Sequence, residues 1–216
     1  MIMHDSINNL ILIKKEIQEI NPICQLIVVT KTFGIEKIEP IIKTGHKHFG
    51  ENKVQEALEK WTETKDNNKD IKLHLIGKLQ TNKVKFCLPL FDYIHGLDNI
   101  KLAEKIANEQ VKKNFKPKIF IQINIGDEDQ KGGVKQNELL EFYKKIIKEF
   151  DLDIIGLMCI PPFVDDTSPF FIKMKVLSEK IKLKELSMGM SGDYIQAAKN
   201  AATFIRVGSK IMGKRD

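Results

Sequence analysis

The sequence predicts an α/β protein in which eight parallel strands close into a single (β/α)₈ barrel of the TIM type. Short β-branched apolar runs alternate with helix-length amphipathic stretches, which is the pattern of repeated βα units. Eight such strand segments occur along the chain. The length of 216 residues is near the lower end of what an eightfold barrel needs, so residues 1–216 are expected to form one domain.

The expected elements follow one another in a regular rhythm. An amphipathic helix in the first 16 residues precedes the first strand. The expected strands cover residues 26–31, 47–50, 72–77, 92–95, 118–124, 153–160, 185–189 and 203–208. The expected helices cover residues 35–45, 54–65, 99–114, 137–150, 169–183 and 193–200, with a shorter one from Thr81. An open, doubly wound parallel sheet is the alternative fold.

Composition limits the classes of function. The net charge of +6 invites a nucleic-acid partner, but the basic residues are spread over the chain and only Arg206 and Arg215 are arginine. Because phosphate and base recognition favour arginine, no nucleic-acid binding is expected. No apolar run approaches the roughly 20 residues of a membrane span. The three cysteines lack metal-site spacing, so we expect no metal. Together with the lack of a membrane span, the cysteine content predicts a cytoplasmic protein without a membrane partner.

Lys31 is the first candidate functional residue. In a barrel of this type the active site lies at the carboxyl ends of the strands, and Lys31 ends an apolar strand. Burial there would lower the pKa of its amine from about 10.4 and give a nucleophile for carbonyl groups. On position alone, with 33 lysines in the chain, a lysine that simply reaches solvent is the more common outcome.

Two loops late in the chain are candidate anion sites. Ser191 and Gly192 lie in a small, polar segment that leads into a helix, and Gly208 and Ser209 follow the last strand. Free backbone N–H groups at such positions bind phosphate, and the late loops of barrels are a frequent phosphate site. An ordinary serine–glycine turn is the alternative for each.

Arg206 lies inside an apolar strand of a lysine-rich chain. This position suggests a need for an always-charged planar donor, with a structural salt bridge as the alternative. A lysine amine, a phosphate cradle and a buried arginine together suit pyridoxal 5′-phosphate (PLP). Without the arginine, the same residues would also suit a cofactor-free Schiff-base aldolase acting on a sugar phosphate.

Several long motifs carry a family resemblance over nearly the whole chain. They are VVTKT (28–32), FGENKVQE (49–56), LHLIGKLQTNK (73–83), IQINIGDEDQKGGV (121–134), IGLMCIPP (155–162), LSMGMSGD (186–193) and IRVGSKIMGKRD (205–216). In these motifs the chain resembles the pyridoxal phosphate homeostasis protein family, often labelled YggS or PROSC. The resemblance implies a barrel similar to the N-terminal domain of alanine racemase.

The resemblance also implies roles for particular residues. Lys31 would hold PLP as a covalent aldimine, and Arg206 would face the pyridine nitrogen. The phosphate would be held by Ser191, Gly192, Gly208 and Ser209. The ring pocket would be lined by Asn52, His74, Ile76 and Met158.

The expected role is to hold PLP reversibly, as a carrier or buffer in PLP homeostasis, and not to act as an enzyme. An arginine opposite the pyridine nitrogen keeps that nitrogen unprotonated, which weakens the ring as an electron sink. The three tyrosines, Tyr93, Tyr143 and Tyr194, do not obviously supply the base that a racemase uses. A PLP-dependent amino-acid racemase and the aldolase are the alternatives. We expect PLP as the ligand, PLP-dependent apo-enzymes as its recipients, and a monomeric state.

Overall fold

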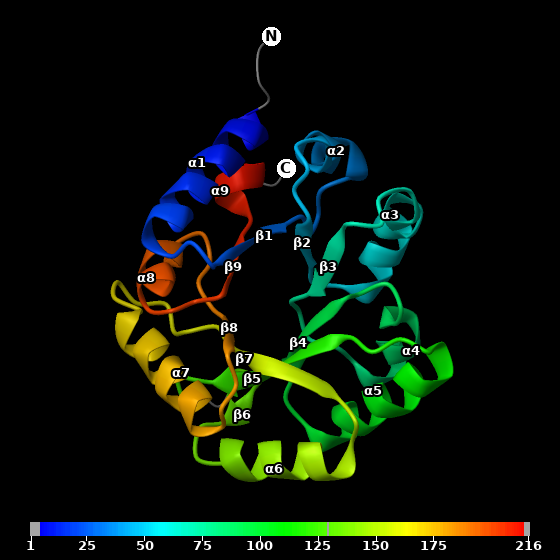
Figure 1. Ribbon diagram of the computed structural model, residues 1–216, viewed down its shortest axis with the longest axis vertical. Helices are drawn as coiled ribbons and strands as arrows, with labels where there is room; N and C mark the ends of the chain where they lie inside the picture. The colour runs from blue at the N-terminus through cyan, green and yellow to red at the C-terminus, as the bar shows by residue number, and fades with distance from the viewer. Residues whose placement is uncertain (1–4, 129, 214–216) are drawn as a thin grey trace.

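The computed structural model describes residues 5–128 and 130–213, which form a closed parallel barrel surrounded by helices (Figure 1). The barrel strands are β1 (Gln25–Val29), β2 (His48–Glu51), β3 (Lys72–Leu75), β4 (Tyr93–Leu97), β5 (Lys118–Asn124), β7 (Asp153–Cys159), β8 (Glu185–Ser187) and β9 (Phe204–Val207). The helices are α1 (Asp5–Ile20), α2 (Ile35–Lys43), α3 (Val54–Asn67), α4 (Val84–Cys87), α5 (Ile100–Lys113), α6 (Leu139–Glu149), α7 (Ser168–Lys180), α8 (Tyr194–Lys199) and α9 (Ser209–Met212).

The eight strands form a ring because β4 pairs with β5 while β1 pairs with both β2 and β9. All of these pairings are parallel, so the predicted barrel is confirmed and the open sheet is wrong. Two elements were not predicted: α9, and the short strand β6 (Val134–Lys135), which pairs with β5 outside the ring. The first strand also ends earlier than expected, at Val29, which leaves Lys31 in the loop that follows.

Helix α1 lies outside the barrel and packs against α8 and α9, so the two ends of the described chain lie close together (Figure 1). Its buried residues Leu10, Ile13 and Ile17 recur at helical spacing and form one apolar face. The side chains of Asn9 and Asn21 donate hydrogen bonds to carbonyl groups near the C-terminal end of the chain.

Side chains alternate between the barrel interior and the helix layer, as the twofold period of a strand requires. On β1, Leu26 and Val28 belong to the large core under the helices, whereas Ile27 belongs to a small apolar cluster inside the barrel. The other buried members of this inner cluster are Tyr93, Phe120, Met158 and Phe204. Lys31 follows the carboxyl end of β1 by two residues, which places its backbone at the mouth of the barrel.

Buried histidines are an unusual part of the interior. His74 and His95 are fully buried, and His46 is nearly so. The ring of His74 stacks on Tyr93, and that of His95 stacks on Phe120. Burial disfavours the imidazolium, which lowers the pKa of His46 to about 3 and holds the pKa values of His74 and His95 well below 6.5.

A buried ion pair fixes α3 to the ends of β1 and β2. Glu51 accepts hydrogen bonds from Lys60, from the indole of Trp61 and from the hydroxyl of Thr30. The Glu51 side chain is 0 % exposed and that of Lys60 is 7 % exposed. Lys60 also pairs with Glu56, one helical turn earlier.

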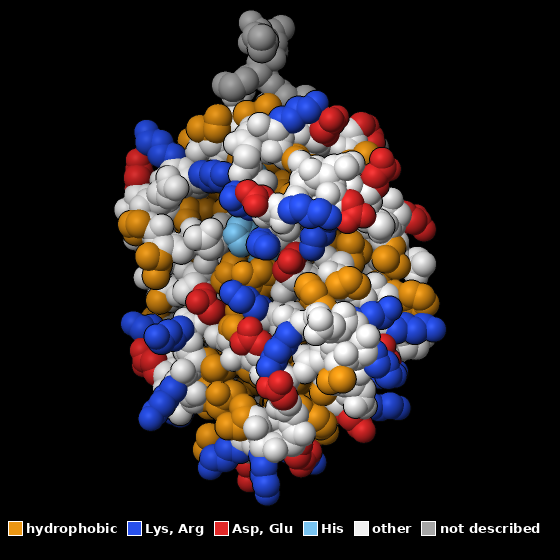
Figure 2. All heavy atoms as spheres, turned by 45° about the vertical axis from the view of Figure 1, so that its right-hand side comes forward, with side chains coloured by type: hydrophobic (Ala, Val, Ile, Leu, Met, Phe, Trp, Pro, Cys, Tyr) orange, Lys and Arg blue, Asp and Glu red, His pale blue; other side chains and the backbone are white. Residues whose placement is uncertain are grey.

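The visible face of the molecule carries lysine and acidic side chains interspersed with apolar ones, with no broad field of one charge (Figure 2). Within the described ranges, none of the helices combines the length and apolarity that a membrane crossing requires.

Lys60→Met should lower the free energy of unfolding by roughly 3–5 kcal/mol, because it leaves the carboxylate of Glu51 buried without its cation. Urea unfolding measures this. Lys69→Met is the matched control, since Lys69 and Asp66 form an exposed pair and its loss should cost no more than about 1 kcal/mol. Equal stability losses in the two variants would show that the buried pair does not hold α3.

Stability should fall as the pH drops below 6.5. Above that pH the three buried histidines are neutral in both states, and their contribution is complete. Below it, the unfolded chain takes up protons that the native interior excludes, at about 1.4 kcal/mol per pH unit for each histidine and about 4 kcal/mol for three. The half-buried His48, whose pKa is lowered to about 4, adds to the same slope. Unfolding measured from pH 7 to 5 would show this slope. A flat profile would mean that His46, His74 and His95 titrate normally in the native protein.

Candidate functional site

The candidate site lies where β1, β8 and β9 end side by side. Val28 pairs with Val207, so the chain segments that follow these two strands leave the barrel together. A Cβ atom on Gly208 would lie 3.3 Å from the Cβ of Val29, which shows how closely the two segments approach. The barrel therefore brings Lys31 into the neighbourhood of the loop at Gly208 and Ser209.

The backbone on both sides of Lys31 is held by α3. The carbonyl of Thr30 accepts a hydrogen bond from Lys60 at 2.9 Å, and the N–H of Thr32 donates to Glu56. Thr32 has a φ of +70°, a left-handed conformation that a β-branched residue adopts only when its surroundings enforce it. The half-buried Lys31 is thus attached to a backbone fixed by charged side chains.

The two predicted anion loops meet at one corner of the mouth. The N–H of Gly208 donates to the hydroxyl of Ser191 at 3.3 Å. In the part of the chain that the structure describes, no acceptor receives the N–H groups of Ser191, Gly192 or Ser209. Open space surrounds Gly192, where an added Cβ atom would meet nothing within 4 Å. Converging free donors of this kind fit a phosphate group.

Arg206 points into the barrel and is 3 % exposed. Its guanidinium donates to the hydroxyl of Ser187 at 2.6 Å and to the carbonyl of Cys159 at 2.8 Å. Over residues 5–128 and 130–213, no carboxylate forms an ion pair with it, so the salt-bridge alternative finds no support. Burial lowers its pKa from the ordinary value of 12.5, but a guanidinium remains charged in proteins. Asp193 acts on Arg206 only through its charge and not through a hydrogen bond, so the buried cation leaves room for an acceptor from a ligand.

The four residues predicted to line a ring pocket lie at different depths. Asn52 follows β2, and Ile76 follows β3 on the inward side, where its side chain faces Gly50. Met158 is buried in the inner apolar cluster. His74 lies a layer deeper, and both of its ring nitrogens already bond to other histidines.

Sequence reasoning missed the residues that support Arg206. Ser187 bonds to both Arg206 and His95, and the sequence gives it no predicted role. The sequence signal for this contact is that Ser187 and Arg206 both occupy positions on neighbouring strands that face the barrel interior. Asn124, which also ends a strand, instead holds the loop after β5 through Glu128.

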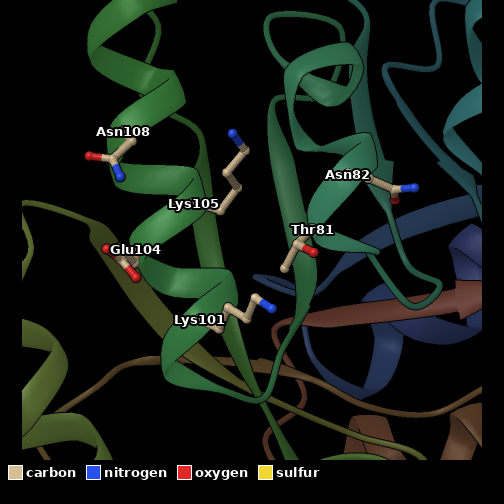
Figure 3. A pocket seen from close by; sticks show the side chains of 6 residues that line it. All are labelled: Thr81, Asn82, Lys101, Glu104, Lys105 and Asn108. Carbon is tan, nitrogen blue, oxygen red and sulfur yellow. The ribbon is translucent and has the colours of Figure 1, made fainter.

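A separate pocket of about 360 Å³ lies on the outer wall between α5 and the turn Thr81–Lys83 (Figure 3). Its lining includes Lys101, Lys105 and Glu104. Lys105 already pairs with Glu109. Because this pocket is away from the carboxyl ends of β1, β8 and β9, it does not share the chemistry of the mouth.

Comparison with known proteins shows the family to which the chain belongs. The family model described as "Alanine racemase, N-terminal domain" matches residues 8–216. A relative from Aquifex aeolicus, named pyridoxal phosphate homeostasis protein, is 36% identical over 200 residues, covering 88% of this chain and 87% of the relative. A relative of the same name from Pasteurella multocida is 38% identical over 203 residues, covering 89% and 87%.

A solved structure of PipY from Synechococcus elongatus without PLP superposes with a TM-score of 0.89 at 31% identity, covering 97% of this chain and 100% of PipY. PipY with PLP bound superposes with a TM-score of 0.83 at the same identity, covering 93% and 100%. The chain thus belongs to the family of the alanine racemase N-terminal domain, and within it to the pyridoxal phosphate homeostasis proteins.

Proposed function

We propose that this chain binds PLP as a Schiff base on Lys31 and serves PLP homeostasis as a carrier or buffer, with little turnover of its own. The observation that carries the proposal is the buried Arg206, which no carboxylate of the described residues hydrogen-bonds and which pairs with Ile27 on the strand that leads to Lys31. Its relatives support the cofactor: the Aquifex and Pasteurella proteins are named for PLP homeostasis, and PipY has been solved with PLP.

The donor set at the mouth fits the chemical groups of PLP. The N–H groups of Ser191, Gly192 and Ser209 suit a phosphate dianion, with Gly208 allowing close approach. The guanidinium of Arg206 suits the lone pair of the pyridine nitrogen, and Ile76 and Met158 offer apolar surface to the ring. Asn52 at the rim and His74 beneath would complete that pocket. When bound, PLP supplies an electrophilic aldehyde and an electron-withdrawing ring.

The positions of the tyrosines favour a holding role over racemization. Tyr93 is stacked on His74 in the inner layer, and the hydroxyl of Tyr194 donates to Glu16 of α1. Tyr143 lies on the outer helix α6. None of the three phenols is thus aimed at Lys31 as a second base. Arg206, fixed as a cation, opposes protonation of the pyridine nitrogen and so weakens carbanion chemistry.

We further infer a cytoplasmic monomer that delivers PLP to PLP-dependent apo-enzymes. The cytoplasmic location follows from the cysteine content, the monomeric state from the lack of a sustained heptad pattern in the sequence, and delivery from the reversible bond that a lysine amine forms with an aldehyde.

Lys31→Ala should abolish the absorbance band that a PLP Schiff base gives on titration with PLP, and should weaken binding at least about tenfold. The phosphate corner would keep some affinity, since it is separate from the amine. Lys78→Ala is the control, because Lys78 is an exposed lysine that follows the end of β3. An undiminished band in Lys31→Ala would mean that another lysine holds the cofactor.

Arg206→Gln should weaken PLP binding by roughly 10- to 100-fold, because hydrogen bonds made by a charged group are worth about 1.5–3 kcal/mol. Equilibrium dialysis measures the affinity, and circular dichroism checks that the barrel is folded. Unchanged affinity in a folded variant would show that Arg206 has only a structural role.

A further inference from the structure

A continuous chain of hydrogen bonds runs through the barrel from Arg206 toward its opposite end. Arg206 donates to the hydroxyl of Ser187, which lies 2.8 Å from Nδ1 of His95. Nε2 of His95 lies 2.9 Å from Nδ1 of His74, and Nε2 of His74 lies 2.9 Å from Nδ1 of His48. The three histidines come from the neighbouring strands β2, β3 and β4 and occupy inward positions.

The chemistry of the first donor favours one direction for the whole chain. A guanidinium can only donate, so Ser187 accepts from Arg206 and its own proton is available for Nδ1 of His95. His95 then carries its proton on Nε2 and donates to His74. By the same rule, His74 carries its proton on Nε2 and donates to His48. Each link is then satisfied once, with every ring neutral.

The burial of the rings supports this neutral state. The pKa values of His74 and His95 are held well below 6.5 by burial, and the pKa of His48 is lowered to about 4 by burial and by nearby Lys72. A second cation beside Arg206 would also be repelled, since Arg206 itself lowers the pKa of His95.

The far end of the chain opens into a hollow at the amino-terminal end of the barrel. This hollow, of about 230 Å³, is lined by His48 together with Lys14, His46 and Lys47. His48 is only half-buried, so the last ring can exchange its outer proton with solvent. Histidine atoms are visible beside lysine at the surface in Figure 2.

We propose that one ordered relay positions the Arg206 guanidinium and orients its N–H groups. The relay is formed by Ser187, His95, His74 and His48. They are positioning residues, since they act through Arg206. The relay deepens the proposed function, because the object of this positioning is the pyridine nitrogen of PLP. The existence of the relay itself does not depend on PLP binding.

Nitrogen-15 NMR of histidine-labelled protein tests the relay first without PLP. We expect His95, His74 and His48 to be neutral tautomers protonated on Nε2, with Nδ1 as the acceptor. Ser187→Ala removes the first link and should change the tautomer balance of His95. His48→Leu removes the last acceptor and should change that of His74, so the two variants probe both ends even if one fails to fold.

His46→Gln is the matched control, because His46 is also buried but its ring contacts the backbone carbonyl of His48 and the ring of Phe49, and it is not a member of the hydrogen-bonded chain. It should leave the His74 and His95 signals in place. Rings protonated on Nδ1 in the wild type, or unchanged His95 and His74 signals in the two relay variants, would overturn the relay.

A PLP titration then tests the positioning role. Ser187→Ala should weaken PLP binding about tenfold, because a guanidinium that the serine no longer holds is misplaced relative to the ring nitrogen, while Ser187→Thr, which keeps the hydroxyl, should restore it at least in part. Ordered tautomers with unchanged PLP affinity in Ser187→Ala would refute positioning. A wild-type protein that binds no PLP would refute the proposed function instead, and the tautomer result would be unaffected.

Discussion

The burial of the Arg206 guanidinium is the constraint on which the interior of this barrel depends. An arginine keeps its charge in any protein environment, and removing that charge from water is costly unless acceptors surround it. Ser187 and the carbonyl of Cys159 supply two acceptors, and no carboxylate in the described ranges supplies a third. The charge therefore remains incompletely compensated at the mouth, where an acceptor from a ligand gains most.

Lys31 is placed by a different device. Its strand ends at Val29, and the next residues turn sharply enough to require a left-handed Thr32. That strain, of order 1–3 kcal/mol, is offset by the Glu51, Lys60 and Glu56 cluster, which bonds to the backbone on both sides of Lys31. The backbone that carries Lys31 and the guanidinium of Arg206 are thus fixed by separate networks, one outside the barrel wall and one inside it.

The barrel could be predicted from the sequence because its eight apolar runs are short, β-branched and separated by amphipathic helices. The two-residue strand β6, which pairs with β5 outside the ring, is too short to carry such a pattern. For the site, strand ends placed Lys31 and the loop at Gly208 on the same face. The contacts of Ser187 and His95 could not be predicted, because they join residues 92 positions apart across the barrel.

The same limit applies to charge. The isolated arginine of the last apolar strand was visible in the sequence, but whether a carboxylate met it depended on which side chains the closed barrel brings inside. The inward positions around Arg206 hold histidine, serine and aromatic residues, and no carboxylate of the described residues forms an ion pair with it.

Borohydride reduction of the PLP-treated protein, followed by peptide mass mapping, tests the central claim most directly. The account predicts a phosphopyridoxyl group on the peptide that contains Lys31, with the other lysines largely unmodified. Label spread over many of the 33 lysines, or concentrated on a different one, would contradict it.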